Sequence, residues 1–330
     1  MPRATRDRSI VRGVAITGVA LVAAPAAFVA LAGRVAPGWI EALCSPWTVH
    51  CAVVLLAAAL SLGVLRARRL AVAAAVLAAW PAAVALPVLV TGQRSSAPAS
   101  LRVVSMNVLV GTQPSEQALA WLASIDADVV AIVECSTPWS DALAAMLDGD
   151  APRWPHAIVA PDDDGAGGIA IFSRHPLQDA TAALAPVAAF QHASAILQHP
   201  DGPIRLWAVH PMPPVSPRAT VVRNAELAWL ANTVAAAPVP TIVLGDLNET
   251  PFGAAWSRFV TASGLQDARR GAGWVPTWPT RMKGVPMPAW IGIPIDHCLV
   301  SARIAVDAFS AGPDIGSDHR PIVVDLAPAW

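Results

Sequence analysis

The segment TIVLGDLN, residues 241–248, decides the fold, because an apolar, β-branched run stops abruptly at two polar side chains, Asp246 and Asn248. A run of this kind predicts a buried strand. Polar side chains stand in the same way at or beside the ends of five other strand-like runs: SMN at 105–107, VEC at 133–135, AVH at 208–210, IDH at 295–297 and SDHR at 317–320. One such strand end is ordinary, whereas six of them predict a single cleft at one edge of the sheets.

Strand-like and helical patterns alternate through the second part of the chain, and no internal repeat is visible. Helices are predicted at 115–125, where Ser115 is the expected N-cap, and at 140–147, 218–237 and 252–263. Strands are predicted at 101–108, 128–135, 167–174, 194–200, 203–210, 241–248, 295–301 and 319–326. Many strands mixed with a few helices predict an α/β layered sandwich.

The first hundred residues differ in composition from the rest. They hold nine arginines and two acidic residues, a net charge of +7, whereas residues 101–330 hold 13 basic and 21 acidic residues, a net charge of −8. Across the whole chain 55% of residues are hydrophobic and 14% are charged, against about 25% charged in a typical soluble domain. This composition excludes a disordered chain and an ordinary soluble protein.

Three charge-free apolar stretches, at 13–33, 42–65 and 70–93, are each long enough to cross a bilayer. Transmembrane helices are therefore predicted at about 13–33, 46–65 and 70–91. Two spans are the alternative, because the third stretch contains two prolines. The first stretch is too long for a cleaved signal peptide. We therefore expect a membrane anchor at 1–93, a linker at 94–100 and a folded domain at 101–330.

Arginine placement predicts the orientation of these spans. The N-terminal tail carries four arginines and the loop at 66–69 carries three, whereas the loop between the first two spans has only Arg34, offset by Glu41. The positive-inside rule therefore places the N-terminus in the cytoplasm and the domain at 101–330 outside the cytoplasmic membrane. Cys44 and Cys51 pair as a disulfide only if their local geometry allows it.

The segments SMNV, IVEC, GGIAIFSRHPL, AVHP, VLGDLNETPF, PIDHCLVS and GSDHRPIV, in this order, resemble the endonuclease/exonuclease/phosphatase superfamily over about 101–330. This resemblance implies a four-layer α-β-β-α sandwich with a Mg²⁺-dependent phosphoesterase site. The three-span anchor, together with the HPMPP and TWP segments, also resembles the membrane-bound branch of the superfamily that is associated with glycopeptide (teicoplanin-type) resistance.

The predicted metal ligands follow from the preference of Mg²⁺ for oxygen donors. Glu134 is the expected carboxylate ligand, with Asn107 beside it and Asp318 completing the set; Mn²⁺ is the alternative ion. Asp246 and Asn248 lie two apart, so on an extended strand both point the same way. Asp246 would orient or deprotonate water and Asn248 would donate to the phosphate, whereas the alternative for this pair is a structural Asx-turn.

The resemblance pairs His319 with Asp296, which would orient the imidazole so that it contacts the scissile phosphate or handles its proton. His210 would hydrogen-bond a phosphate oxygen. His297 is expected on the opposite strand face, in a structural position. Arg174 either supports the phosphate or pairs with a loop carboxylate.

The substrate is predicted from charge and from one apolar segment. A domain with a net charge of −8 and a single lysine, Lys283, argues against strong nonspecific nucleic-acid binding. Residues 273–297 are rich in Trp and Met, and Trp290 is the candidate contact for a lipid chain; the alternative is a loop that packs its tryptophans into the fold. The prediction is hydrolysis of a polyprenyl or other lipid (pyro)phosphate on the outer face of the membrane.

Two other functions stay open at this point. One is an extracytoplasmic phosphodiesterase or nuclease that acts on nucleic acid or phospholipid headgroups. The other is a catalytically inactive member that serves as a membrane interaction module, which the presence of both Glu134 and His319 disfavours.

Overall fold

The computed structural model describes residues 2–90, 92, 98–146 and 153–328, and the chain divides into two compact units, Met1–Pro87 and Val88–Trp330. Most of the predicted linker, residues 94–97, lies outside the described residues. The two units are described separately below.

The first unit is helical. It contains α1 (Pro2–Val35), α2 (Gly38–Cys44), η1 (Ser45–Trp47), α3 (Thr48–Val64) and most of α4 (Arg68–Val90). Three segments are long and apolar enough to cross a membrane: Ser9–Val35, Gly38–Val64 and Arg68–Val90. This confirms three long apolar N-terminal helices. The thiols of Cys44 and Cys51 are free, so the two cysteines do not form a disulfide.

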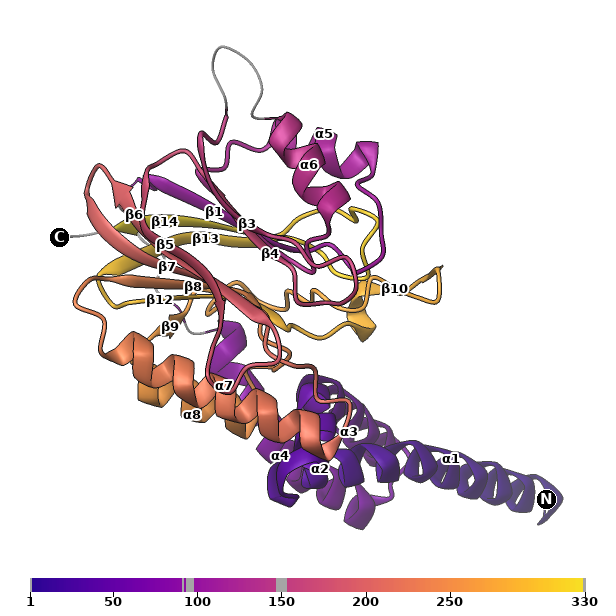
Figure 1. Ribbon diagram of the computed structural model, residues 1–330. Helices are drawn as coiled ribbons and strands as arrows, with labels where there is room; N and C mark the ends of the chain where they lie inside the picture. The colour runs from indigo at the N-terminus through magenta and orange to yellow at the C-terminus, as the bar shows by residue number, and fades with distance from the viewer. Residues whose placement is uncertain (1, 91, 93–97, 147–152, 329–330) are drawn as a thin grey trace. The chain divides into compact units, whose positions relative to one another are not determined.

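The second unit is built around two six-stranded mixed sheets (Figure 1). The first sheet has the order β13 (Ile304–Ala311), β14 (Ile322–Pro328), β1 (Leu101–Asn107), β2 (Val129–Val133), β4 (Ile169–Ser173) and β3 (His156–Ala160). The second has the order β5 (Leu177–Leu184), β6 (Gln191–His199), β7 (Gly202–Val209), β8 (Thr241–Asp246), β12 (Asp296–Val300) and β9 (Gln266–Asp267). A short hairpin, β10 (Arg281–Met282) with β11 (Val285–Pro286), is separate.

The two sheets pack face to face. In their central strands every second residue points to the partner sheet, and most of these residues are apolar. Val103 and Val129 from the first sheet and Leu206 and Leu244 from the second belong to one buried core between the sheets. The intervening residues face outward and are also buried, as expected for strands covered on both sides.

Helices cover the two outer faces (Figure 1). The helices α5 (Glu116–Ser124) and α6 (Thr137–Ala145) pack through Leu122 and Trp139 onto the first sheet. The helices α7 (Pro217–Ala235) and α8 (Ala254–Ser263) pack through Leu230 and Phe259 onto the second. The result is the predicted helix–sheet–sheet–helix sandwich.

Four strands that the sequence pattern did not predict, β3, β5, β9 and β13, are the four edge strands of the two sheets. Their burial is interrupted; six of the eight residues of β5, for example, are exposed. An edge strand faces solvent along one side, so it lacks the continuous apolar run that revealed the central strands.

Candidate active site

The central strands of both sheets bring their polar ends to one place. β1 and β2 are parallel and lead to Asn107 and Glu134, and β7 and β8 are parallel and lead to His210 and Asp246. Strand β12 runs antiparallel to β8 and starts with Asp296, directly opposite Asp246. The segment before β14 supplies Asp318 and His319. These are the ends that the sequence predicted to meet in one cleft.

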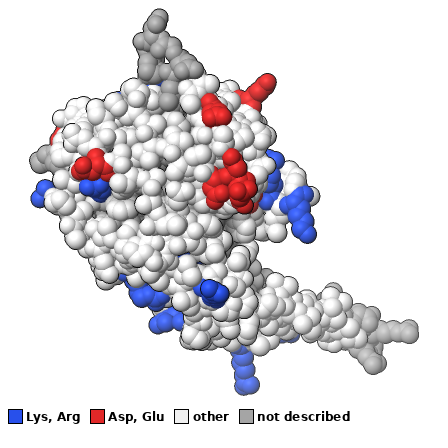
Figure 2. All heavy atoms as spheres, viewed as in Figure 1, with Lys and Arg blue, Asp and Glu red and all other residues white. Residues whose placement is uncertain are grey.

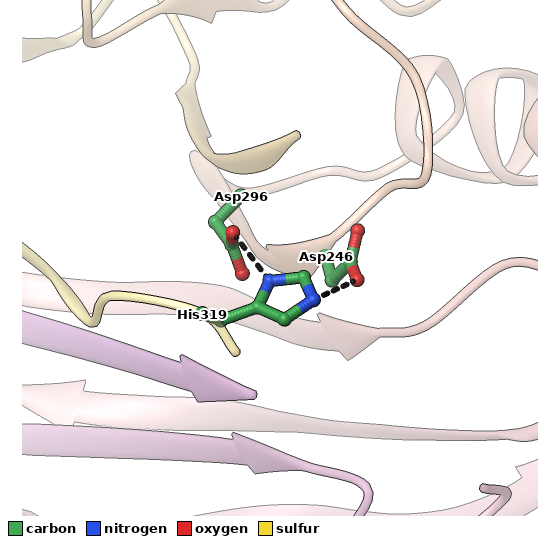
Figure 3. Close-up of side chains that lie close together, drawn as sticks. All are labelled: Asp246, Asp296 and His319. Atoms are coloured by element: carbon green, nitrogen blue, oxygen red, sulfur yellow. Dashed lines mark hydrogen bonds and ion pairs between the residues drawn. The ribbon is translucent and has the colours of Figure 1, made fainter. Parts of the chain in front are cut away.

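His319 lies between two buried carboxylates (Figure 3). Its Nδ1 lies 2.9 Å from Asp296 Oδ2 and its Nε2 lies 3.6 Å from Asp246 Oδ2. A carboxylate accepts and does not donate, so Nδ1 donates to Asp296, and this fixes the orientation of the ring. The ring therefore presents Nε2 to the interior of the cluster.

The protonation of this trio follows from burial and charge. Burial raises the pKa of Asp246 to about 6, with the neighbouring Asp296 raising it further and His319 opposing the rise. Burial lowers the pKa of His319, but Asp296, Asp246 and Asp318 outweigh that effect and raise it to about 10. Between these values the pair is a carboxylate facing an imidazolium.

Asn107 joins the two sheets across the site. Its Nδ2 donates to Glu134 Oε1 at 2.8 Å and to Asp246 Oδ2 at 3.2 Å, while its Oδ1 accepts from the Leu109 amide at 3.0 Å. The Leu109 N–H fixes the orientation of the Asn107 side chain. If the side-chain amide were flipped, its NH₂ group would face the Leu109 N–H, donor against donor. In this structure Asn107 therefore offers the cluster an amide NH₂ rather than an oxygen.

His210 completes the ring of groups around Asp246. Its Nδ1 donates to the Ala166 carbonyl at 3.1 Å, and its ring stacks on Phe190. The other nitrogen, Nε2, then faces Glu134 Oε1 at 3.7 Å and Asp246 Oδ2 at 3.8 Å. This placement leaves Nε2 pointing into the site.

The donor set suits a cation. One ligand atom each from Asp246, Asp296 and His319 lie within 4.8 Å of one another. Glu134 and Asp318 border the same group, and among the described residues no Lys or Arg side chain hydrogen-bonds to or ion-pairs with any of the four carboxylates. The buried oxygens Asp296 Oδ1 and Asp318 Oδ1 have no hydrogen-bond partner there either. A divalent ion would supply the missing partner and charge.

For Asn248 the structure shows the Asx-turn alternative, whereas its donation to the phosphate stays a prediction. The Asn248 amide N–H donates to Asp246 Oδ1 at 2.8 Å, which is an Asx-turn contact, and the backbone is left-handed with φ 50°. Its side-chain Nδ2 donates to the Pro211 carbonyl at 3.0 Å. Asn248 thus ties the end of β8 to the segment after His210.

Two predicted substrate contacts lie apart from this cluster. Arg174 follows β4 at the end that pairs with the start of β2, and its guanidinium ion-pairs with Asp126 and Asp128. This corrects the phosphate-binding alternative for Arg174: the side chain lies at the opposite end of the strands from Glu134 and is held by loop carboxylates. Trp290, in η2 (Ala289–Ile291), is 71% exposed rather than part of the cluster.

Several groups around the site escaped the sequence analysis. Trp278 Nε1 donates to Asp318 Oδ2 at 2.9 Å. Arg223, Glu249 and Arg269 are buried behind the loops that carry the cluster. A signal for Arg223 was available, because it lies at helical spacing within the stripe of α7 that includes Ala219, Leu227 and Leu230, where a charge is costly.

Comparison with known proteins agrees with this geometry. Residues 104–319 match the model of the Endonuclease/Exonuclease/phosphatase family, and the chain belongs to that family. No curated protein matches the sequence significantly.

Solved structures with the same fold include three that illustrate its range. One is an endonuclease/exonuclease/phosphatase from Beutenbergia cavernae, with 20% identity, a TM-score of 0.53, and coverage of 69% of this chain and 72% of that one. Another is the 3′ phosphatase NExo from Neisseria bound to a product DNA hairpin, with 18% identity, a TM-score of 0.55, and coverage of 70% and 100%. A third is TDP2 from D. rerio complexed with single strand DNA product, with 18% identity, a TM-score of 0.56, and coverage of 69% and 98%.

Proposed function

We propose that this family member is a membrane-anchored, divalent-metal-dependent phosphoesterase that hydrolyses a lipid-linked phosphate or pyrophosphate. The observation that carries the reaction class is the buried group of Asp246, Asp296 and His319, bordered by the partly exposed Glu134 and Asp318, in which two carboxylate oxygens have no hydrogen-bond partner. A group of this kind gains most from a bound cation and an anionic substrate.

The roles of the side chains follow from their contacts. Asp246 faces the site with Oδ2 and is the proposed base that orients and deprotonates water. Asp296 holds His319 through Nδ1, so that Nε2 is available to the phosphate or to the leaving oxygen. Glu134 and Asp318, with the nearby carboxylates of Asp246 and Asp296, are the proposed set that holds Mg²⁺ or Mn²⁺. The ion, when bound, would neutralise charge on the phosphoryl oxygens.

A lipid substrate is supported by the segment beside the site. Met282, Val285 and Trp290 are 53%, 63% and 71% exposed, and this segment also contains Trp278, which contacts Asp318. A small cavity there has a mixed polar and apolar lining, made by Pro276, Thr277, Trp278, Pro279, Thr280, Met287, Ala289, Gly292 and Arg320. Apolar and aromatic surface next to a phosphate site fits an amphiphilic substrate.

Charge and anchoring support the same choice. The domain has a net charge of −8, and on the face in Figure 2 the charged side chains form small separate patches without a continuous basic stripe. Three candidate spans suggest a membrane protein. We propose that the catalytic domain lies on the outer face, because the arginines of the N-terminal tail and of the loop at 66–69 place those segments in the cytoplasm.

The first test is release of phosphate from undecaprenyl pyrophosphate by the full chain in proteoliposomes with Mg²⁺. The blank is Glu134→Ala, which removes a carboxylate from the cluster. Metal-dependent release that is absent from the blank supports the proposal. No release above the blank rejects this substrate, and a phosphodiester such as a phospholipid headgroup or nucleic acid becomes the next candidate.

A second test separates lipid recognition from catalysis. We expect Trp290→Asp combined with Met282→Asp to lower kcat/KM on the lipid about tenfold, the effect of losing roughly 1.4 kcal/mol of apolar contact. Hydrolysis of a water-soluble phosphoester should change far less. Leu184→Asp is the matched control, because Leu184 is a 62% exposed apolar residue on β5, outside the segment. Equal losses on both substrates would refute the role of the segment.

A further inference from the structure

The buried face of α7 contains a charge whose position calls for an explanation. Arg223 is 1% exposed on the helix face that packs through Leu227, Leu230 and Val234 and that also buries Glu226 beside His192. A guanidinium in such a place is costly unless every donor has a partner. Its partners therefore show what the residue does.

The guanidinium of Arg223 contacts the turn after β8 and its own neighbour along α7. Arg223 Nη1 donates to the Asn248 carbonyl at 2.7 Å, and Nη2 lies 2.9 Å from Glu249 Oε2. The remaining donors, Nε and Nη2, bond to Asn224 Oδ1. The planar guanidinium thus contacts two consecutive residues of the turn, Asn248 and Glu249, on the side that faces α7.

This turn sets the geometry of the site. Asn248 is left-handed, a conformation that asparagine adopts more readily than most residues other than Gly. In that conformation its amide donates to Asp246 Oδ1, and its side chain holds the carbonyl of Pro211, next to His210. Releasing the Asn248 carbonyl would therefore loosen both Asp246 and the His210 segment.

The network continues to the second carboxylate beside His319. His297 Nε2 donates to the Glu249 carbonyl at 2.8 Å, so its Nδ1 is the acceptor for Arg269 Nη1 at 3.1 Å. Arg269 also donates through Nη2 to the carbonyl of Asp296. Two buried arginines, Arg223 and Arg269, thus hydrogen-bond to the backbone carbonyls of Asn248, two residues after Asp246, and of Asp296.

We propose that Arg223 is a positioning residue of the phosphoesterase site: from α7 it holds the Asn248–Glu249 turn and so sets the orientation of Asp246. The inference rests on the proposed phosphoesterase function. Arg223 does not face the site, so its loss should lower kcat and leave KM little changed. Groups that support the direct ligands of a site typically contribute roughly 10–100-fold to activity.

The test compares Arg223→Gln, Arg223→Lys and the control Arg218→Gln in the full chain. Arg218 lies on the same helix and is exposed, so the control makes the same chemical change without touching the turn. With a water-soluble phosphate or pyrophosphate ester as reporter we expect Arg223→Gln to lower kcat at least about tenfold with KM within about threefold. A lysine can reach one acceptor, so Arg223→Lys should be intermediate.

Hydrogen exchange provides a readout that does not depend on activity. Amides in residues 245–250 should exchange at least about tenfold faster in Arg223→Gln than in the wild type or in Arg218→Gln, while peptides from the first sheet should be unchanged. Unchanged kcat and exchange would overturn the proposal. So would faster exchange throughout the domain with a kcat loss equal to the unfolded fraction, because that result shows a general structural role. An inactive wild type would instead reject the proposed function, and the exchange comparison would still decide whether Arg223 holds the turn.

Discussion

At the scale of single residues, the site gathers more negative charge than its histidines balance. Asp246 and Asp296 flank His319, and Glu134 and Asp318 lie beside them. Bringing these carboxylates together destabilises the folded state, because a carboxylate loses its hydration when it is buried. The cost indicates that the group has a function. The arrangement is consistent with a site that holds a cation and catalyses phosphoryl chemistry.

Glu134→Gln should lower metal-dependent phosphoester hydrolysis at least about a hundredfold, since a metal supplies several kcal/mol of charge stabilisation. The fold should be retained, because glutamine keeps the size of the side chain and can still accept from one of its two donors, Asn107 Nδ2 or the Val110 amide. Mg²⁺ should raise the Tm of the wild type by mass action and raise that of the variant much less.

The matched control for this prediction is Glu116→Gln, which makes the same change at an exposed position in the first turn of α5. It should behave as the wild type in both assays. Equal metal-dependent Tm shifts in wild type and Glu134→Gln would remove Glu134 from the proposed ligand set.

The pH dependence follows from Asp246 acting as a carboxylate. Burial raises its pKa to about 6, so the group is ionised above that pH and takes up a proton as the pH falls through it. We expect kcat/KM at limiting metal to fall about tenfold per pH unit below pH 6. Higher Mg²⁺ stabilises the carboxylate and should move this limb to lower pH.

His319 should not limit activity on that acid side, because its pKa is raised to about 10 and it keeps its proton throughout. A profile of kcat/KM from pH 4.5 to 8 at two Mg²⁺ concentrations checks this. Activity at limiting metal that stays level down to pH 4.5 would contradict the proposed role of Asp246.

At the scale of elements, the helices on the outer faces hold the loops that form the site. Ser115 is the N-cap of α5, as predicted: its Oγ accepts from the Ala118 amide at 3.0 Å and donates to the Ile315 carbonyl at 3.0 Å. The second bond ties α5 to the segment that leads to Asp318. One side chain thus both starts a helix and positions a loop of the cluster.

Ser115→Ala should reduce the stability of the second unit by about 1–2 kcal/mol, because it removes the cap and leaves the Ile315 carbonyl without this donor. For a domain of this size the Tm should fall by roughly 2–6 °C, measured by tryptophan fluorescence in detergent. Ser124→Ala, at the exposed end of the same helix, should shift the Tm by less than about 1 °C. Similar shifts in both variants would refute the special role of the cap.

The elements also show why prediction succeeded for some strands and failed for others. The strands that lead to Asn107, Glu134 and Asp246 are buried almost throughout and appear in the sequence as mainly apolar runs. The edge strand β5 is largely exposed and Ala-rich, so its sequence resembles that of a loop. The buried arginines escaped notice for a related reason, because a charge in a helix is normally at the surface.

At the scale of the whole molecule, three candidate spans precede a family domain with the opposite net charge. The orientation predicted from the arginines has a direct chemical test. Lys283 is the chain's only lysine and lies exposed in the hairpin turn between β10 and β11. An amine reagent that cannot cross the membrane therefore reports where the domain lies.

In intact cells we expect this reagent to label the wild type at Lys283, because the positive-inside rule places the domain outside. Lys283→Arg should lose the label, leaving only the N-terminal amine, which is expected to be cytoplasmic and protected. Labelling of Lys283 only after the cells are permeabilised would reverse the orientation.

The order of apolar runs and polar strand ends in the sequence was enough to predict the sandwich, the three apolar helices and the convergence of Asn107, Glu134, Asp246, Asp296 and His319. Those features depend on local periodicity and on strand direction, which neighbouring residues encode. Three features were decided by the tertiary structure alone. Arg174 pairs with loop carboxylates away from the site, Asn107 offers the cluster an amide NH₂, and Arg223 holds the Asn248–Glu249 turn. Each of these depends on which distant side chain is within hydrogen-bond reach, and only the packing of the layers brings those partners together.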